Sequence, residues 1–263
     1  MNGVVTDLFV YPVKGLSAQP MHEVALEPGR GVPGDRAFAL ARPDGRYMPG
    51  RSQTLSKDQF FVLLKNARLA GLRTRLDPGS RHITVSVRDH EVLSCDLGTP
   101  GGIAAFEELF AHVLDLPEEQ RPLLAHDPSH PFTDVSVVSG KLMHAVSVIN
   151  LESVRDLERR TGHEIDPRRF RANVYVDGLP PFSELGLVSE PFQAGAEVRL
   201  GDIRATAVLN TRRCAAIEVN PTNARRDLPL PRLLMEHYGH AEIGVYVSLT
   251  SGGLLRTGDP VTW

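Results

Sequence analysis

Glycine and proline interrupt this chain at short intervals, which excludes long continuous helices over most of its length. The 263 residues include 23 glycines and 20 prolines. Turn-forming residues between short apolar runs favour strands and tight turns over a helical bundle. The apolar runs are also shorter than the roughly 20 residues that a membrane-spanning helix needs, so we expect no membrane span. The pattern predicts a mainly β protein with short helices, in the α+β class.

Alternation of apolar and polar residues places the strands of the first half. The segment that begins at Gly3 is predicted to form a strand interrupted at Pro12, and residues 81–97 alternate over a length that fits a hairpin. Another strand is expected over residues 37–42. The Asp44-Gly45 pair that follows it favours a tight hairpin turn, because both central positions of such a turn need a positive φ.

Helical spacing of apolar residues appears in three segments. Residues 101–116 predict an amphipathic helix. Residues 151–161 predict a second helix, with Asn150 as its N-cap and Gly162 at its end. Residues 230–239 predict a third, short helix. Helices are therefore a minor part of the expected fold.

The second half alternates short strands with glycine turns. A hairpin is expected with Gly201-Asp202 at its tip, followed by a turn at Cys214 and another strand. Residues 241–263 predict a closing set of strands. Many short strands with few helices favour a barrel or half-barrel.

A proline- and histidine-rich segment, residues 117–134, separates the two halves. We place the domain division there, which predicts an N-terminal module over residues 1–122 and a second domain over residues 123–263. Loops of this composition commonly connect domains.

Charge and cysteine content narrow the functional classes. The net charge is −3 and the sequence pI is about 6.4, which argues against nucleic-acid binding through a basic surface. Two distant cysteines form no disulfide framework and no zinc or iron–sulfur spacing. The first residues do not resemble a signal peptide. We expect a cytoplasmic protein with reduced thiols.

Cys214 is the main candidate for chemistry. In "LNTRRCAAIEVNP" it follows Arg212 and Arg213, whose charges would favour its thiolate form. A free cysteine is also often a small buried apolar residue, as we expect for Cys95. A thiolate here could attack a substrate, carry sulfur or ligate a soft transition metal. Because no zinc-type ligand spacing accompanies it, a metal bound here would take its other ligands from an organic cofactor.

Basic residues elsewhere offer a second hint. Lys14, Arg36 and Arg171 follow short strands or turns, and Asn173 lies close to Arg171 in "RFRAN". Each alone fits a solvated surface charge. Together they would suit a phosphate-bearing anion, because arginine offers paired hydrogen bonds to phosphate. The residues themselves leave both interpretations open.

Three motifs carry a resemblance to a known family. "LFVYPVKGLSAQPMHEVALEPGRGVPGDRAFAL" resembles the N-terminal β-barrel module that precedes MOSC domains. "DPRRFRANVYVDG", "RRCAAIEVNPTN" and "LRTGDPV" resemble the MOSC domain itself. The arrangement is similar to that of the mitochondrial amidoxime reducing component and its bacterial relatives. The resemblance implies a β-barrel-like N-terminal module followed by a MOSC β-barrel domain.

The resemblance also implies a molybdenum cofactor, a molybdenum–pyranopterin with or without a nucleotide, whose metal Cys214 would ligate. Residues at the family's cofactor contacts are Lys14, Arg36, Arg171, Asn173 and Arg213. His144 is expected to replace a hydroxyl contact of the relatives. The implied activity is the reduction of small N-hydroxylated or N-oxygenated compounds.

Electrons for that reaction would come from a separate protein, because the sequence has no flavin or nicotinamide fingerprint. The expected donor is ferredoxin-like or a cytochrome or flavin reductase. Two alternatives stay open. Cys214 could carry a persulfide delivered by a pyridoxal-phosphate enzyme, or the chain could be a degenerate cofactor-binding scaffold, as His144 and the divergent "NPTNARRD" loop suggest.

Overall fold

The computed structural model describes residues 2–77 and 79–263, and its strands form four sheets, one of which closes on itself. The first eight strands are β1 (Gly3–Val10), β2 (Gln19–Met21), β3 (Glu23–Leu26), β4 (Phe38–Ala41), β5 (Arg73–Leu76), β6 (His82–Val87), β7 (His90–Asp96) and β8 (Leu123–His126). The others are β9 (Val146–Asn150), β10 (Val174–Asp177), β11 (Glu197–Leu200), β12 (Ile203–Arg212), β13 (Glu242–Leu249), β14 (Gly253–Arg256) and β15 (Pro260–Thr262). The α-helices are α1 (Pro100–Leu114), α2 (Leu151–Thr161) and α3 (Leu230–Tyr238). The expected class, mainly β with short helices, is confirmed.

Seven strands form a closed barrel in the order β10, β9, β13, β12, β11, β15 and β1, and β1 pairs again with β10. Most neighbours are antiparallel, whereas β9 and β10 run parallel. Small and branched apolar side chains fill the interior, including Val148, Val176 and Val245. The barrel forms because alternate residues of each strand point inward and bury this apolar surface.

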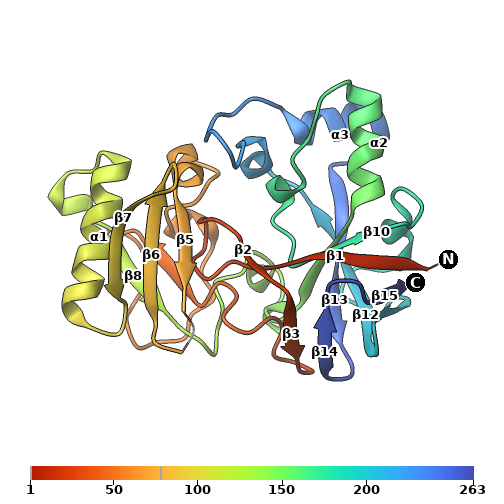
Figure 1. Ribbon diagram of the computed structural model, residues 1–263, viewed down its shortest axis with the longest axis horizontal. Coiled ribbons are helices and arrows are strands. Elements are labelled where there is room, and N and C mark those ends of the chain that lie inside the picture. The colour runs from red at the N-terminus through yellow and green to blue at the C-terminus, as the bar shows by residue number, and fades with distance from the viewer. Residues whose placement is uncertain (1, 78) are drawn as a thin grey trace.

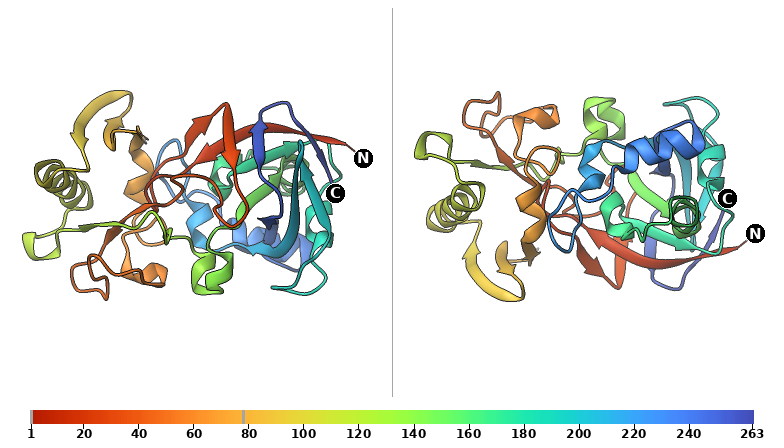
Figure 2. Two further views of the ribbon diagram at one scale, coloured as in Figure 1. Left: turned by 90° about the horizontal axis from the view of Figure 1, so that it is seen from below. Right: turned by 90° about the horizontal axis from the view of Figure 1, so that it is seen from above.

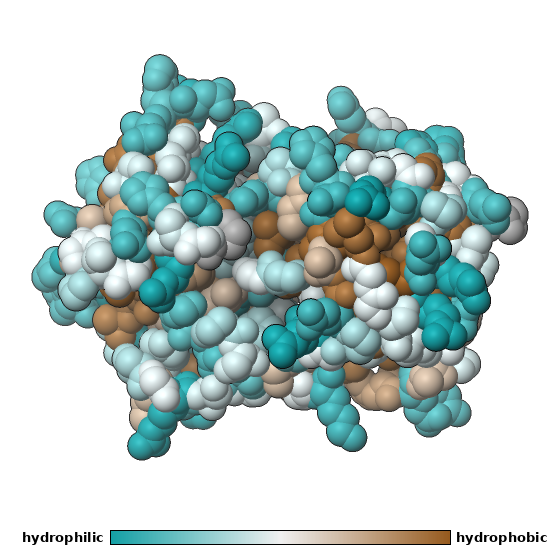
Figure 3. Space-filling model, turned by 60° about the horizontal axis from the view of Figure 1, so that its bottom comes forward, coloured by the Kyte–Doolittle hydropathy of each residue, from teal (hydrophilic) through white to brown (hydrophobic). Residues whose placement is uncertain are grey.

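The other lobe packs α1 against the sheet of β5, β6 and β7 (Figure 1). Thr99 caps α1 by accepting a hydrogen bond from the backbone N–H of Gly102 at 3.1 Å. Phe106 and Phe110, one turn apart, are fully buried. Both further views in Figure 2 keep the two lobes side by side. Figure 3 shows a largely hydrophilic surface, with hydrophobic residues gathered near the middle and over the barrel side.

Strand pairing crosses the predicted domain division in both directions. β1, from the start of the chain, belongs to the barrel, whereas β8, which begins at Leu123, pairs with β4 of the first lobe. The division at residues 122 and 123 therefore stays a prediction. β2 and β3 also lie on the barrel side, where β2 pairs with β1 and β3 with β14. The two ends of the chain lie close together beside the barrel (Figure 1).

Helix α2 covers the barrel next to α3 (Figure 1). As predicted, Asn150 is its N-cap, and its side chain accepts a hydrogen bond from the N–H of Glu152 at 3.1 Å. Gly162 ends the helix in the left-handed conformation that glycine adopts without strain. Both ends of α2 could be predicted because a helix cap depends only on neighbouring residues.

Two expected elements differ in the structure. Asp44-Gly45 forms a turn, in which the Gly45 N–H donates to Arg42 O at 3.0 Å, but β4 pairs with the distant β8 rather than with a following strand. The strand expected after Cys214 is instead a short 3-10 helix, η8 (Ala215–Glu218). In addition, β5 had no predicted counterpart, and the prediction of a loop over residues 117–134 was wrong where β8 forms and pairs with β4. Pairing partners far away in sequence decided these cases.

Candidate functional site

A cavity of about 610 Å³ lies where the first lobe meets the barrel. Its walls come from the loops around β4, the segment after β8, and the barrel strands β9, β12 and β13. Seven cationic side chains line it, against three carboxylates. The lining cations are Lys14, Arg36, Lys57, Arg169, Arg171, Arg212 and Arg213. Such an excess of positive charge favours an anionic ligand.

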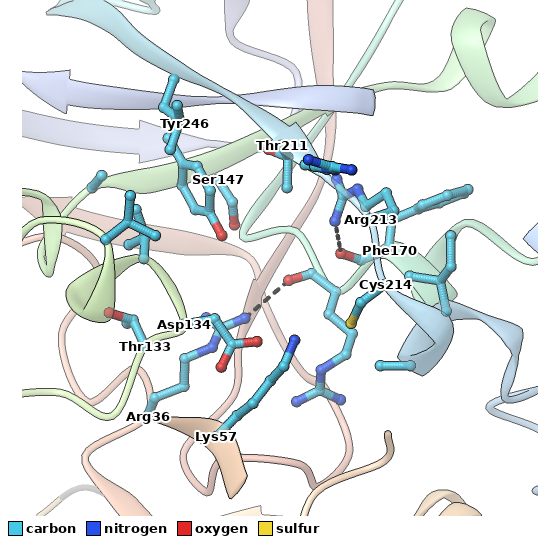
Figure 4. Close-up of a pocket in the computed structure, with 18 of the residues that line it drawn as sticks. Arg36, Lys57, Thr133, Asp134, Ser147, Phe170, Thr211, Arg213, Cys214 and Tyr246 are labelled. Carbon is cyan, nitrogen blue, oxygen red and sulfur yellow. Dashed lines mark hydrogen bonds between the residues drawn. The ribbon is translucent and has the colours of Figure 1, made fainter. Parts of the chain in front are cut away.

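Cys214 lines this cavity two residues after the last residue of β12 and immediately before η8. Its side chain is half-buried, and Figure 4 shows its sulfur pointing into the space that Lys57 also faces. Cys95, in contrast, is buried in the core of the first lobe. The two cysteines therefore differ in surroundings, and Cys214 alone can reach a ligand in this cavity.

Arg213 is held by backbone carbonyl groups. Its Nε and Nη2 donate to Ile243 O at 2.9 and 2.6 Å, and its Nη1 donates to Phe170 O at 2.7 Å (Figure 4). Burial lowers the pKa of Arg213. Carbonyl oxygens orient a guanidinium without neutralising it, so the full charge of Arg213 stays available to a ligand.

Arg36 and Arg171 pack on one buried ring. Their guanidinium carbons lie 4.8 and 4.5 Å from the centre of the Tyr11 ring. Arg36 pairs with Asp35 and donates to Arg171 O at 3.1 Å, while Arg171 donates to Leu16 O at 2.7 Å. Tyr11 therefore lies between two cations that would otherwise repel each other.

The backbones of these two arginines are also unusual. Arg36 has φ 51° and Arg171 has φ 55°. This left-handed region costs a residue other than glycine about 1 kcal/mol or more. Strain of this kind persists where the surroundings fix a side-chain direction. Burial lowers the pKa of Arg171, whose hydrogen bonds, like those of Arg213, go to backbone oxygen.

Lys14 is 6% exposed and lies at the junction of the lobes. Its Nζ donates to Phe132 O at 2.9 Å and forms an ion pair with Asp134. Burial lowers the pKa of Lys14, and Asp134 raises it. The lysine thus ties the loop after β1 to the segment that connects the two halves.

Asn173 lines the cavity, but most of its polar groups already have partners. Its Oδ1 accepts from Ser147 Oγ at 2.7 Å, and its Nδ2 donates to Phe9 O at 3.2 Å. These bonds join β1, β9 and β10. One N–H of the amide is left for a ligand, so a cofactor contact by Asn173 stays a prediction.

His144 is the one predicted site residue that the structure does not bring to this cavity. The six others all line it: Lys14, Arg36, Arg171, Asn173, Arg213 and Cys214. The backbone of His144 instead packs under Gly31, where an added Cβ would lie 2.6 Å from His144 O. Burial lowers the pKa of its imidazole. Its expected hydroxyl-replacing contact therefore has no support from its position.

Several lining residues were not predicted. Lys57, Ser147 and Tyr246 face the cavity (Figure 4), and nothing in their local sequence sets them apart from surface or strand residues. Thr211 and Asn210 lie in the "NTRRC" segment that was singled out, so they could have been found. Among the described residues, Thr211 Oγ1 and Asn210 Oδ1 are buried without a hydrogen-bond partner. Buried oxygens without a partner, on two residues that line the cavity, suit a ligand with donor groups.

Comparison with known proteins agrees with this geometry. A family model described as "MOSC N-terminal beta barrel domain" matches residues 2–113, and one described as "MOSC domain" matches residues 135–262. Together they span most of the chain. The chain belongs to the MOSC-domain family. The barrel and Cys214 lie in its MOSC domain, apart from β1, which the N-terminal domain contributes.

This MOSC-domain chain is also similar to curated proteins along almost its whole length. It is 21% identical to mitochondrial amidoxime-reducing component 1 of Mus musculus, covering 98% of this chain and 82% of that protein. It is 24% identical to the Xenopus laevis protein of the same name, covering 98% and 81%. A solved structure, the YUAD protein from Bacillus subtilis, is 14% identical with a TM-score of 0.43, covering 99% of this chain and 94% of that one.

The MOSC site offers a metal one protein sulfur. Across residues 2–77 and 79–263, no group of three or more histidine, cysteine, aspartate or glutamate side chains could hold a metal ion. A metal at Cys214 would thus need other ligands from an organic group, whose anionic parts the cavity's cations would suit. The residues present fit such a group: one soft sulfur, uncompensated guanidinium charge and unpartnered buried oxygens. In that part of the chain, none of the helices has the length and hydropathy for crossing a bilayer.

Proposed function

We propose that the protein is a molybdenum-cofactor-dependent reductase of small N-hydroxylated or N-oxygenated compounds. The single observation that carries the proposal is the position of Cys214. Its sulfur lies in a cavity with more cations than carboxylates, and Arg171 and Arg213 there are bonded to backbone oxygens. The names of the curated relatives, amidoxime-reducing components, supply the substrate class.

Several residues that line the cavity would have distinct roles toward the cofactor. Cys214 would provide the protein's sulfur ligand to the metal. Arg171 and Arg213 would bind anionic groups of the pyranopterin through charge-assisted hydrogen bonds. Arg36, held by Asp35 and Tyr11, would fix the position of Arg171 from the N-terminal domain. Thr211 and Asn210 would accept hydrogen bonds from pterin N–H groups.

The bound cofactor would supply a two-electron redox centre able to accept oxygen from the substrate. The net reaction converts R–N–OH, two electrons and two protons into R–N–H and water. Tyr246 faces the same cavity, and burial raises the pKa of its hydroxyl, so that hydroxyl stays protonated and can donate a hydrogen bond to the departing oxygen. The chain's own residues would thereby orient the N–O bond.

Electrons would come from a separate protein, because the sequence has no flavin, nicotinamide or iron–sulfur signature. A ferredoxin or a cytochrome or flavin reductase would serve. The sulfur-carrier and empty-scaffold alternatives have no specific observation in their favour. A persulfide needs one accessible thiolate, and it would leave the other converging cations without a role.

The test is production in a host that makes the cofactor, followed by metal analysis and assay. We expect close to one molybdenum per chain and reduction of benzamidoxime to benzamidine with a chemical electron donor. Protein that is folded but holds neither molybdenum nor tungsten would refute the proposal. A reducible mass increase of about 32 Da on Cys214, without metal, would favour the sulfur carrier instead.

A further inference from the structure

A buried carboxylate, Glu184, lies outside the cavity and has no role in the proposed function. It belongs to η7 (Ser183–Leu187) and is 0% exposed. Its two oxygens accept from Ser153 Oγ at 2.8 and 2.9 Å, and Oε1 also accepts from the Gly244 N–H at 3.3 Å. Asn150 Nδ2 donates to Oε2 at 3.5 Å. The Gly244 and Asn150 groups can only donate, whereas the Ser153 hydroxyl can donate or accept, and these donors favour the ionised carboxylate.

The peptide group between Ile243 and Gly244 connects this carboxylate to the cavity. Its N–H donates to Glu184, while its carbonyl oxygen accepts both Nε and Nη2 of Arg213. One peptide dipole thus lies between a buried anion and a buried cation, with its positive end toward the anion and its negative end toward the cation. Each charge strengthens the hydrogen bond that the other makes.

The local backbone leaves room for this arrangement only because residue 244 is glycine. Gly244 has φ +86°, a conformation that other residues rarely adopt. A Cβ there would lie 2.7 Å from Val148 O and 2.9 Å from Arg213 Nη2. The side chain of Arg213 therefore packs directly on the Gly244 backbone.

We propose that Glu184 is a positioning residue that holds Arg213, through the 243–244 peptide, in the direction required for an anionic ligand beside Cys214. The function of this Arg213 orientation rests on the proposed cofactor site, whereas the hydrogen bonds from Glu184 to Arg213 do not depend on it. We call the hydrogen bonds that connect Glu184 to Arg213 through the 243–244 peptide the brace. Because Arg213 immediately precedes Cys214, the brace would also limit movement of the cysteine.

Stability alone does not account for Glu184. Burial raises the pKa of this carboxyl, which means that folding disfavours its ionised form. Within the described chain it forms no ion pair with a lysine or arginine. A buried carboxyl without a cationic partner lowers stability, and such groups are often retained for a site. Glu184 also bonds Ser153 of α2, so the test must separate bracing of Arg213 from anchoring of the helix.

The first experiment uses the apoprotein and measures the arginine Nε–H signals by nuclear magnetic resonance. The Arg213 signal is identified by its absence in Arg213→Lys. In Glu184→Gln, which keeps the shape but removes the charge, we expect the Arg213 Nε–H to exchange with solvent about tenfold faster or more. Asp177→Asn is the matched control, because it removes a carboxylate bonded to α2 that makes no hydrogen bond to Arg213 or to the 243–244 peptide. Unchanged exchange in folded Glu184→Gln overturns the proposal.

Should Glu184→Gln not fold, Ser153→Ala replaces it. That variant removes the hydroxyl that donates to both carboxylate oxygens and leaves every partner of Arg213 in place. We expect a smaller but measurable acceleration of Arg213 Nε–H exchange. No acceleration beyond that of Asp177→Asn contradicts the brace.

The second experiment measures molybdenum per chain after extended dialysis of holoprotein. We expect Glu184→Gln to retain the metal about tenfold more weakly than wild type, the size usual for partners of ligand-holding groups. If Glu184→Gln retained molybdenum as wild type does although its Arg213 Nε–H exchanged faster, the link between Glu184 and the cofactor would be refuted. Wild-type protein that never holds molybdenum would refute the proposed function, while the exchange measurement would still judge the brace.

Discussion

Arg155 on helix α2 and two arginines of the cavity, Arg171 and Arg213, are held by different partners. Arg155 of α2 binds both oxygens of Asp177 at 2.7 Å each and Glu152 at 2.6 Å. In the cavity, Arg171 and Arg213 donate to backbone carbonyls instead. The first arrangement neutralises charge, whereas the second orients charge and leaves it uncompensated.

The difference teaches how one residue type serves two purposes. A guanidinium with a carboxylate partner stabilises the fold modestly and attracts no further anion. A guanidinium held only by carbonyls is fixed in direction, yet it still gains from an incoming anion. Partner type therefore distinguishes Arg171 and Arg213 from Arg155 of α2.

The largest expected effect comes from removing the sulfur that the cavity's cations surround. Cys214→Ala should lose bound molybdenum and at least about 99% of N-hydroxyl reduction, because the metal loses its protein ligand. Cys95→Ala, a substitution in the core of the first lobe, should keep bound molybdenum and activity within about twofold of wild type after correction for the amount of folded protein. Metal analysis and benzamidoxime reduction measure these outcomes. Full activity in Cys214→Ala would break the assignment of the site.

Removal of a cavity charge should come next. Arg171→Gln is expected to weaken molybdenum retention about tenfold or more, because an anionic group loses its charged donor. Its melting temperature should not fall much, since the buried charge had no carboxylate partner. Arg155→Gln on α2 is the matched control. If Arg155→Gln impaired retention equally, the contrast between the two sets of arginines would fail.

The α2 pair should respond in the opposite way. Asp177→Asn is expected to lower the free energy of unfolding by about 1 kcal/mol, because the pair is partly exposed. Molybdenum retention should stay at the wild-type level. Chemical denaturation and metal analysis of the same sample give both values. Loss of metal without loss of stability would contradict this division of roles.

The smallest effect is the pH dependence that the Arg155–Asp177 pair contributes to stability. The hydrogen bonds from Arg155 hold the pKa of Asp177 below its usual value. A lowered carboxyl pKa stabilises the protein above the pKa of the unfolded chain, about 3.9, and this stabilisation disappears as pH falls through the folded pKa. The stability difference between wild type and Asp177→Asn should therefore shrink below about pH 4. A difference that grew on acidification would contradict the sign.

The sequence by itself determined the features that depend on neighbouring residues. Asn150 and Gly162 predicted both ends of α2, and alternation predicted the hairpin of β6 and β7. The "RRC" segment identified Cys214 as the residue to examine, and the family motifs identified five further lining residues. These signals are local or carried by short motifs, so the order of amino acids is enough to read them.

Only the tertiary structure decided which distant segments meet. It placed β1 in the barrel and β8 in the first lobe, which no local pattern distinguishes from the reverse. It brought six of the seven predicted site residues to one cavity and left His144 outside it. It also set Glu184 opposite Arg213 across a single peptide group. Such contacts depend on burial and pairing between residues far apart in the chain. They stabilise the protein only after folding has brought those residues together, so no short segment of the sequence predicts them.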